Sequence, residues 1–137
     1  SNTSKFYYQE LKNLETELGI KEHVFFSCPI NDPEKYYNSC DLFILPSKFE
    51  GTPNVLLEAM ACGCVCVASN EANAEGILSD EFSFETNNHK RLSDKIRYVY
   101  EFEDEKIKNV KINNREKVVK EFSIQNMVEN YTNLFSN

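Results

Sequence analysis

The chain has 137 residues, the usual size of a single domain, and 41% of them are hydrophobic, which is enough for one compact core. Its formal net charge of −7 at pH 7 argues against nucleic acid as the main partner, because proteins bind phosphate backbones through clustered Lys and Arg. No apolar run approaches the roughly 18 residues of a membrane-spanning helix, and residues 1–4 have neither the basic nor the apolar region of a signal peptide.

The first predicted elements are a helix, a strand and a second helix. Leucines at helical spacing, followed by Gly19, predict a helix over residues 5–18. The apolar residues 24–28 are typical of a short strand. Asp32 as the N-cap, followed by a proline, predicts a helix over residues 33–39, and we expect its two adjacent tyrosines to serve only in packing.

The alternation continues through the centre of the chain. Residues 42–45 form a continuous apolar run, which is typical of a strand covered on both faces. Thr52 as the N-cap, Pro53 at the first helical position and Gly63 just past the end predict a helix over residues 55–62. Further strands are expected over residues 64–68 and 82–84, and further helices over residues 92–100, 103–120 and 124–135. Apolar strands that alternate with helices predict an α/β fold with a parallel sheet flanked by helices.

Five cysteines stand in apolar surroundings: Cys28, Cys40, Cys62, Cys64 and Cys66. A secreted disulfide framework has an even number of dispersed cysteines, so this pattern is typical of a reduced, cytoplasmic protein. The run from Cys62 to Cys66 suggests metal ligands, but Cys62 ends a predicted helix and neither histidine stands at ligand spacing. We therefore expect these cysteines in the core rather than at a metal.

The loop between the predicted strand 42–45 and the predicted helix 55–62 carries the pattern that points to a function. Ligands of open parallel sheets bind at the carboxyl ends of the strands, where this loop lies. Backbone N–H groups at the start of the helix favour an anion such as a diphosphate. Glu50 precedes the helix and Glu58 lies roughly 7–8 Å along its axis from Pro53, so one ligand can meet the helix start and both carboxylates. A carboxylate that faces two vicinal hydroxyls accepts two charge-assisted hydrogen bonds, which suits a sugar.

The stretch from Asp41 to Gly63 reads DLFILPSKFEGTPNVLLEAMACG. It resembles the retaining nucleotide-sugar glycosyltransferases of the GT-B fold, family 4 (glycosyl transferases group 1). Glu50 and Glu58 have the Glu-x7-Glu spacing of that family, inside its Pro-Ser, Glu-Gly and Glu-Ala-Met-Ala-x-Gly segments. The resemblance extends from about residue 5 to the end. It implies transfer of a sugar from a nucleoside diphosphate-sugar donor to an acceptor hydroxyl, with no metal and no cofactor.

The resemblance also implies roles for individual residues. Glu58 is expected to bind the nucleotide ribose, and Glu50, the expected catalytic residue, a hydroxyl of the donor sugar. The following stretch is expected to bind the donor sugar and the diphosphate through its backbone: Gly51, Thr52, Pro53, Asn54 and Val55. One departure is that the Gly-Gly pair of the family, after the strand 64–68, is replaced by Glu71-Ala-Asn-Ala-Glu75.

A second departure is that the family has two earlier strands in its nucleotide-binding half, with diphosphate-neutralising Arg and Lys, and an acceptor-binding half before them. We therefore expect residues 1–137 to form one partial donor-binding domain of a larger enzyme. The chain alone is then expected to be inactive, and any membrane contact of the larger enzyme would be peripheral. Without the earlier strands, residues 24–28 are expected to pair directly with residues 42–45. The alternatives are two chains that share a sheet, or additional residues that supply the strands.

Other interpretations stay open. Glu50 and Glu58 also fit the acid and base of a glycosidase, whose carboxyls stand about 5 to 9.5 Å apart, although the helix start favours donor binding. A sugar-nucleotide epimerase on the same fold and a non-catalytic sugar-nucleotide-binding module are the alternative functions. Lys48 faces either the phosphates or solvent, and Ser47 either contacts the donor or closes the end of the strand.

Overall fold

The computed structural model describes residues 2–27, 30–126, 128 and 132 of the chain. The contacts within the chain divide it into two compact units, Ser1–Asn31 and Asp32–Asn137. None of the described helices combines the length and the apolar character that a membrane span requires.

The first unit contains helix α1 (Asn2–Glu17) and a short 3-10 helix, η1 (Lys21–His23). Gly19, at a φ of 67°, ends α1, and the amide of Ile20 donates to the carbonyl of Glu15 at 3.0 Å. Glycine adopts this left-handed conformation without steric cost, and the hydrogen bond satisfies a carbonyl of the last turn. The predicted first helix and its stop are therefore confirmed.

The strand predicted over residues 24–28 is wrong where the structure describes it, and Cys28 lies outside the described residues. Residues 24–27 have no regular secondary structure and pair with no described strand, and Phe25 is 89% exposed. The ring of Phe26 instead meets that of Tyr8 edge-on, with 5.2 Å between their centroids. Apolar residues form a strand only where a neighbouring strand forms hydrogen bonds with their backbone. Here Phe26 instead packs its side chain against Tyr8 of α1.

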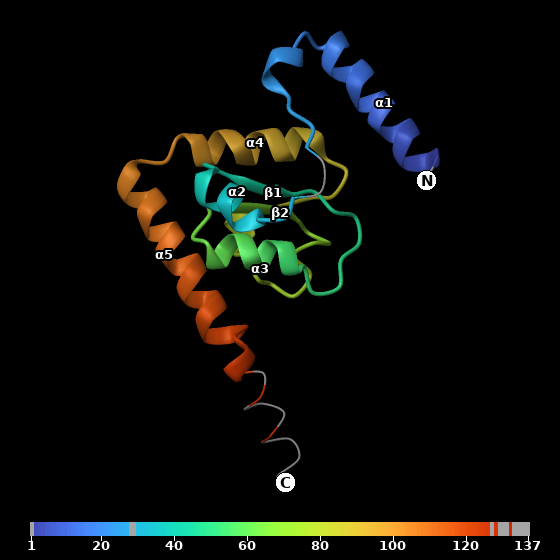
Figure 1. Ribbon diagram of the computed structural model, residues 1–137. Helices are drawn as coiled ribbons and strands as arrows, with labels where there is room; N and C mark the ends of the chain where they lie inside the picture. Colours follow the sequence, from blue (N-terminus) through green and yellow to red (C-terminus); the bar gives the residue numbers. More distant parts are fainter. Residues whose placement is uncertain (1, 28–29, 127, 129–131, 133–137) are drawn as a thin grey trace. The chain divides into compact units, whose positions relative to one another are not determined.

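The second unit alternates helices and strands in this order: α2 (Pro33–Ser39), β1 (Phe43–Leu45), α3 (Asn54–Ala61), β2 (Cys66–Ser69), η2 (Asp80–Phe82), β3 (Ser83–Phe84), α4 (His89–Tyr100) and α5 (Asp104–Glu121). The strands form a parallel sheet in the order β1-β2-β3, with Phe43 opposite Cys66 and Ala68 opposite Ser83. Helices α3 and α4 lie on opposite sides of this sheet (Figure 1). The predicted α/β fold with a parallel sheet flanked by helices is confirmed. The helix predicted over residues 124–135 lies largely outside the described residues.

The central strand β2 is buried along its whole length, whereas β1 is only half-buried. Strand β1 stands at one edge of the three-stranded sheet and pairs with β2 alone among the described strands. The expected direct pairing of residues 24–28 with residues 42–45 is therefore wrong, and so is the expectation that β1 is covered on both faces. An edge strand has a free side that leaves its backbone and part of its side chains accessible.

The core of the second unit surrounds β2: it includes one face of α3, and also buried residues of the segment 77–84 and Val99 of α4. Leu56, Met60, Val65 and Val67 are completely buried. Helix α3 ends as predicted at Gly63, whose φ is 75°, because the amide of Cys64 donates to the carbonyl of Ala59 at 3.0 Å in a second glycine-dependent cap. The end of α3 is therefore fixed relative to the segment that enters β2.

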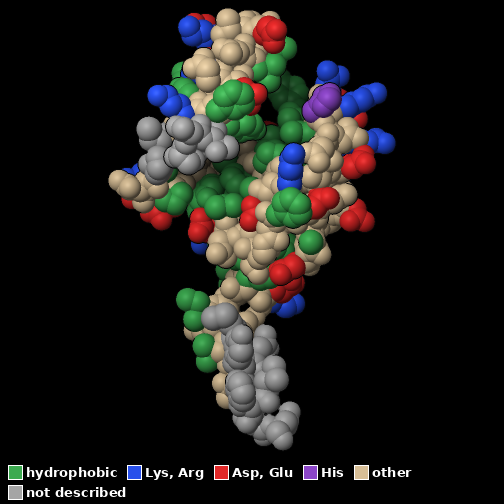
Figure 2. Space-filling model, turned by 90° about the vertical axis from the view of Figure 1, so that its right-hand side faces the viewer, with side chains coloured by type: hydrophobic (Ala, Val, Ile, Leu, Met, Phe, Trp, Pro, Cys, Tyr) green, Lys and Arg blue, Asp and Glu red, His purple; other side chains and the backbone are tan. Residues whose placement is uncertain are grey.

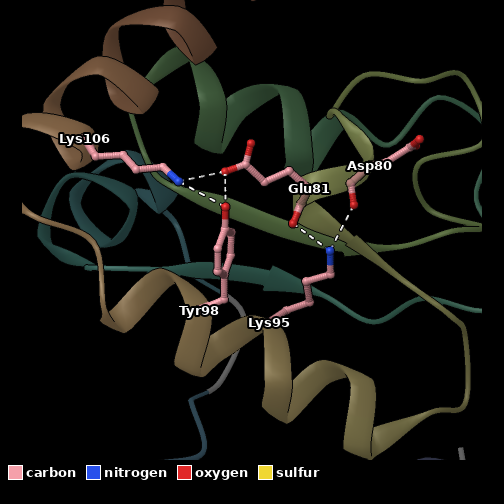
Figure 3. Close-up of polar contacts among 5 residues, drawn as sticks. All are labelled: Asp80, Glu81, Lys95, Tyr98 and Lys106. Carbon is pink, nitrogen blue, oxygen red and sulfur yellow. Dashed lines mark hydrogen bonds and ion pairs between the residues drawn. The ribbon is translucent and has the colours of Figure 1, made fainter.

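Helix α4 begins three residues before its predicted start because the Asn88 side chain caps it, accepting from the Arg91 amide at 3.0 Å. Figure 3 shows the polar contacts that join α4 to α5 and η2. The hydroxyl of Tyr98 donates to Glu81 Oε1 at 2.6 Å, and Lys106 Nζ lies 3.0 Å from the same oxygen. These two donors hold the pKa of Glu81 below its ordinary value.

Hydrophobic side chains are also exposed on the face of the molecule that Figure 2 shows. Among the described residues of the second unit, two aromatic side chains are exposed almost completely, Phe49 at 91% and Tyr100 at 90%. Phe49 belongs to the loop between β1 and α3.

Candidate functional site

The carboxyl ends of β1 and β2 lie side by side at one edge of the sheet, as their parallel pairing requires. The buried hydroxyl of Ser69 donates to the backbone carbonyl of Ser47 and accepts from the amide of Ala72 at 3.3 Å. One side chain thus ties the end of β1 to the loop that follows β2. Ser47 is held at the strand end through its own carbonyl. This favours the interpretation that Ser47 closes the end of the strand over the interpretation that it contacts the donor.

The loop from β1 leads into α3, which begins at Asn54 with Pro53 as the N-cap. The predicted capping by Thr52 is wrong, since the Thr52 hydroxyl donates to Glu75 Oε1 at 3.4 Å, in the loop that follows β2. The reason is that the Pro53 side chain is completely buried, which fixes the entry of the chain into the helix one residue later. The carbonyl of Pro53 accepts from the amide of Leu56 at 2.9 Å.

The start of α3 offers fewer free amides than the sequence predicts. The Asn54 amide donates to the Thr52 carbonyl at 2.9 Å, and Pro53 has no N–H. No acceptor in the described part of the chain pairs with the amides of Gly51, Thr52 and Val55. Three backbone donors therefore remain available to a ligand at the positive end of the helix.

Glu58 extends from α3 and its side chain is exposed. Its Oε2 accepts a hydrogen bond of 3.2 Å from the hydroxyl of Tyr37, which belongs to α2. Burial, together with the negative charge of Glu58 and this hydrogen bond, raises the pKa of Tyr37 to about 12. The Tyr37 hydroxyl therefore keeps its proton at neutral pH and acts as a donor to the carboxylate.

Tyr37 itself is anchored on the sheet and on the cysteines. Its ring meets that of Phe43 edge-on, with 5.5 Å between centroids. Its backbone carbonyl accepts from the thiols of Cys64 at 2.9 Å and Cys40 at 3.4 Å. Burial raises the pKa of Cys64 to about 12, so that this thiol remains protonated and can donate. Cys64 and Cys66 are buried as expected, whereas the role of Tyr37 beyond packing was missed.

Glu50, the expected catalytic residue, lies in the exposed part of the loop between Phe49 and Gly51. It makes no ion pair or hydrogen bond with any residue that the structure describes. The structure thus joins Glu58 to Tyr37 and Thr52 to Glu75, but leaves Glu50 free to face a ligand.

The loop after β2, where the resemblance places a Gly-Gly pair, is stabilised by hydrogen bonds between the Asn73 side chain and the backbone. Asn73 is buried, its Nδ2 donates to the Leu78 carbonyl at 2.9 Å, and its Oδ1 accepts from the Leu78 amide at 2.7 Å. Both functional groups of this amide side chain are used within the loop. Glu75 in the same loop, and Glu50, place negative charge near the start of α3, with Lys48 as the cation of the β1–α3 loop.

The family model described as glycosyl transferases group 1 matches residues 5–117, a stretch that includes the β1–α3 loop. The chain belongs to this family. It is 27% identical over 124 residues to the UDP-Gal:alpha-D-GlcNAc-diphosphoundecaprenol alpha-1,3-galactosyltransferase of Escherichia coli, an alignment that covers 90% of this chain and 32% of that protein. It is 40% identical over 75 residues to the N-acetylgalactosamine-N,N'-diacetylbacillosaminyl-diphospho-undecaprenol 4-alpha-N-acetylgalactosaminyltransferase of Campylobacter jejuni, which covers 53% of this chain and 20% of the relative. The chain thus spans about a third or less of these curated relatives.

Solved structures share the fold of this glycosyltransferase-family chain. A glycosyltransferase from Rickettsia africae superposes with a TM-score of 0.86 at 20% identity, covering 96% of this chain and 36% of that one. The C-terminal domain of a glycosyl transferase group 1 protein from Francisella tularensis gives a TM-score of 0.79 at 19% identity, covering 90% and 66%. The expected fold, that of the C-terminal half of a GT-B protein, is confirmed.

Proposed function

We propose that this chain is the donor-binding domain of a retaining glycosyltransferase and that a nucleoside diphosphate-sugar binds at the start of α3. The observation that carries the proposal is the arrangement of an exposed carboxylate, Glu58, on the helix at whose start the amides of Gly51 and Thr52, in the preceding loop, and of Val55, in the first turn, are free. Membership of the glycosyl transferases group 1 family supports a sugar nucleotide as the ligand.

The dimensions of α3 suit a nucleoside diphosphate. Glu58 stands four residues after Asn54, so its backbone lies about 6 Å along the axis from the first helical residue. In the proposed complex the diphosphate oxygens accept hydrogen bonds from the free backbone amides, and the two ribose hydroxyls donate hydrogen bonds to the carboxylate of Glu58. Glu50 then accepts from a hydroxyl of the donor sugar.

In the proposed transfer, the bond between the anomeric carbon and the diphosphate oxygen breaks, and the nucleoside diphosphate leaves with the electron pair. The acceptor oxygen bonds to the anomeric carbon on the same face and gives its proton to the leaving diphosphate oxygen. Negative charge grows on the leaving diphosphate, so backbone donors fixed at the helix start stabilise the transition state more than the bound donor.

We propose that sugar transfer requires this domain to be joined to an acceptor-binding domain. The chain aligns with only 32% and 20% of the two relatives that are named as transferases, so most of each relative lies outside the aligned region. The carboxylates of Glu50 and Glu75 oppose a diphosphate at this site. Full affinity therefore requires cations from outside the β1–α3 loop. We expect weak donor binding and no sugar transfer by the 137-residue chain alone.

The experiment is a nuclear magnetic resonance titration of the isotope-labelled chain with UDP, GDP and ADP, since weak binding is measurable by this method. The Escherichia coli relative is named for a UDP-linked donor, and a mannosyltransferase of Mycolicibacterium smegmatis that is 30% identical over 83 residues is named for a GDP-linked donor, so more than one base is tested. We expect the amide shifts to centre on Gly51, Thr52 and Val55. Shifts that centre on the Glu81–Lys106 contacts, or no shifts with any of the three nucleotides, would refute the proposal.

A further inference from the structure

We propose that Tyr37 is a positioning residue for Glu58: its hydroxyl holds the carboxylate in the orientation in which it receives both ribose hydroxyls. This inference rests on the proposed role of Glu58 in donor binding. It extends the site from the β1–α3 loop to helix α2, whose residues the sequence motif does not include.

The carboxylate of Glu58 needs such support because its side chain is exposed. A free glutamate side chain samples several rotamers about its three torsions, and binding a diol selects one of them at a cost in conformational entropy. The hydrogen bond of 3.2 Å from Tyr37 already selects a rotamer in the absence of ligand. Preorganisation of this kind strengthens binding without adding a contact to the ligand.

Tyr37 can position Glu58 because Tyr37 is itself held on two sides. Its ring packs edge-on against Phe43 of β1, and its carbonyl accepts the thiols of Cys64 and Cys40. Both the ring and the backbone of Tyr37 are thereby fixed to the sheet and to the turn that follows α3. The Tyr37 hydroxyl is a fixed donor and the Glu58 side chain is a flexible acceptor, so Tyr37 determines the orientation of the Glu58 carboxylate.

The hydrogen bond to Tyr37 leaves enough acceptor capacity for a ribose. An ionised carboxylate has about four lone-pair sites on its two oxygens, and the Tyr37 hydroxyl uses one of them on Oε2. The whole of Oε1 and the second site of Oε2 remain for the 2′- and 3′-hydroxyls. Tyr37 and a ribose can therefore bind the same carboxylate together.

The test compares two ligands in four variants of the chain. The ligands are the nucleoside diphosphate among UDP, GDP and ADP that shifts the loop amides most, and its 2′,3′-dideoxy analogue. The variants are the unchanged chain, Tyr37→Phe, Glu58→Gln and the double variant. The matched control is Tyr36→Phe, since Tyr36 is the adjacent tyrosine of α2, is 55% exposed and has no hydroxyl contact with the described residues.

Tyr37→Phe should weaken binding of the ribonucleotide about twofold to tenfold, the range for releasing one ordered side chain, and leave binding of the dideoxy analogue unchanged. In the Glu58→Gln background the same substitution should have a much smaller effect, because the two residues act as one unit. Tyr36→Phe should change neither affinity.

Equal weakening of both ligands in Tyr37→Phe would show that the residue acts through the fold of the loop, and would overturn the proposal. An unchanged ribonucleotide affinity in Tyr37→Phe would overturn it as well. If Glu58→Gln weakens binding of the ribonucleotide and of the dideoxy analogue equally, or weakens neither, the proposed function of Glu58 fails, and the positioning role fails with it. If Glu58→Gln weakens binding of the ribonucleotide alone, while Tyr37→Phe weakens both ligands equally or neither, only the positioning role is overturned.

Discussion

Replacing Glu58 with alanine removes the carboxylate that is proposed to bind the nucleotide ribose. The side chain is exposed, and its one hydrogen bond with the described residues comes from the Tyr37 hydroxyl, which water can replace. Glu58→Ala should therefore leave the fold intact, since α3 is held by Leu56, Ala59 and Met60 on its buried face. Alanine is also a better helix former than glutamate.

The expected loss follows from the hydrogen bonds that the carboxylate is proposed to accept. Two hydroxyls of the ribose donate to Glu58, and a hydrogen bond to a charged group contributes about 1.5–3 kcal/mol. Because Glu58 is solvated in the free chain, the lower part of this range applies to each bond. Loss of two bonds of about 1.5–2 kcal/mol each makes binding less favourable by about 3–4 kcal/mol, which is roughly a 150-fold to 700-fold rise in Kd.

The assay is the amide-shift titration with the nucleoside diphosphate, with Glu116→Ala on α5 as the control. Glu116 is also exposed and makes no ion pair or hydrogen bond with the described residues. Glu116→Ala should bind normally. An unchanged Kd in a folded Glu58→Ala variant would refute the assignment of the ribose to this carboxylate.

Three further predictions concern other carboxylates. Glu50→Gln should not weaken binding of the free nucleoside diphosphate, since it removes a like charge, and should weaken binding of the nucleotide-sugar in the same titration; equal losses for both ligands would contradict its role at the sugar. Glu75→Gln should strengthen nucleotide binding about twofold, because it removes a like charge worth ~0.5 kcal/mol at roughly 8 Å in water, and added salt should abolish the gain. The pKa of Glu81 is lowered in the folded state by Tyr98 and Lys106, so its contribution to stability is present above the unfolded pKa and is lost as the pH falls through the folded pKa. Tyr98→Phe should therefore reduce the free energy of unfolding in urea near neutral pH and have less effect at about pH 3; an equal loss at both would show that the hydroxyl stabilises the fold independently of the ionised Glu81 carboxylate.

The sequence by itself determined the elements and the motif that depend on local physics. Gly19 and Gly63 end their helices because a left-handed residue is needed there and only glycine takes that conformation freely. The apolar runs at β1 and β2 predicted a parallel sheet, because strands of such sheets are commonly apolar at every position, although only β2 is buried along its whole length. The spacing of Glu50 and Glu58 around the start of α3 is a property of one contiguous stretch, so it was readable without a structure.

Only the tertiary structure decided which side chains meet across the chain. Residues 24–27 have the composition of a strand but pair with no described strand. Whether a segment forms a strand depends on a partner strand elsewhere in the chain, which the sequence of the segment itself does not specify. Thr52 is a good N-cap by residue type, yet the burial of Pro53 moves the helix start and turns the Thr52 hydroxyl to Glu75. Tyr37 meets Glu58 from 21 residues away because α2 packs against α3, and that distance is set by the packing of two helices on one sheet rather than by any spacing along the chain.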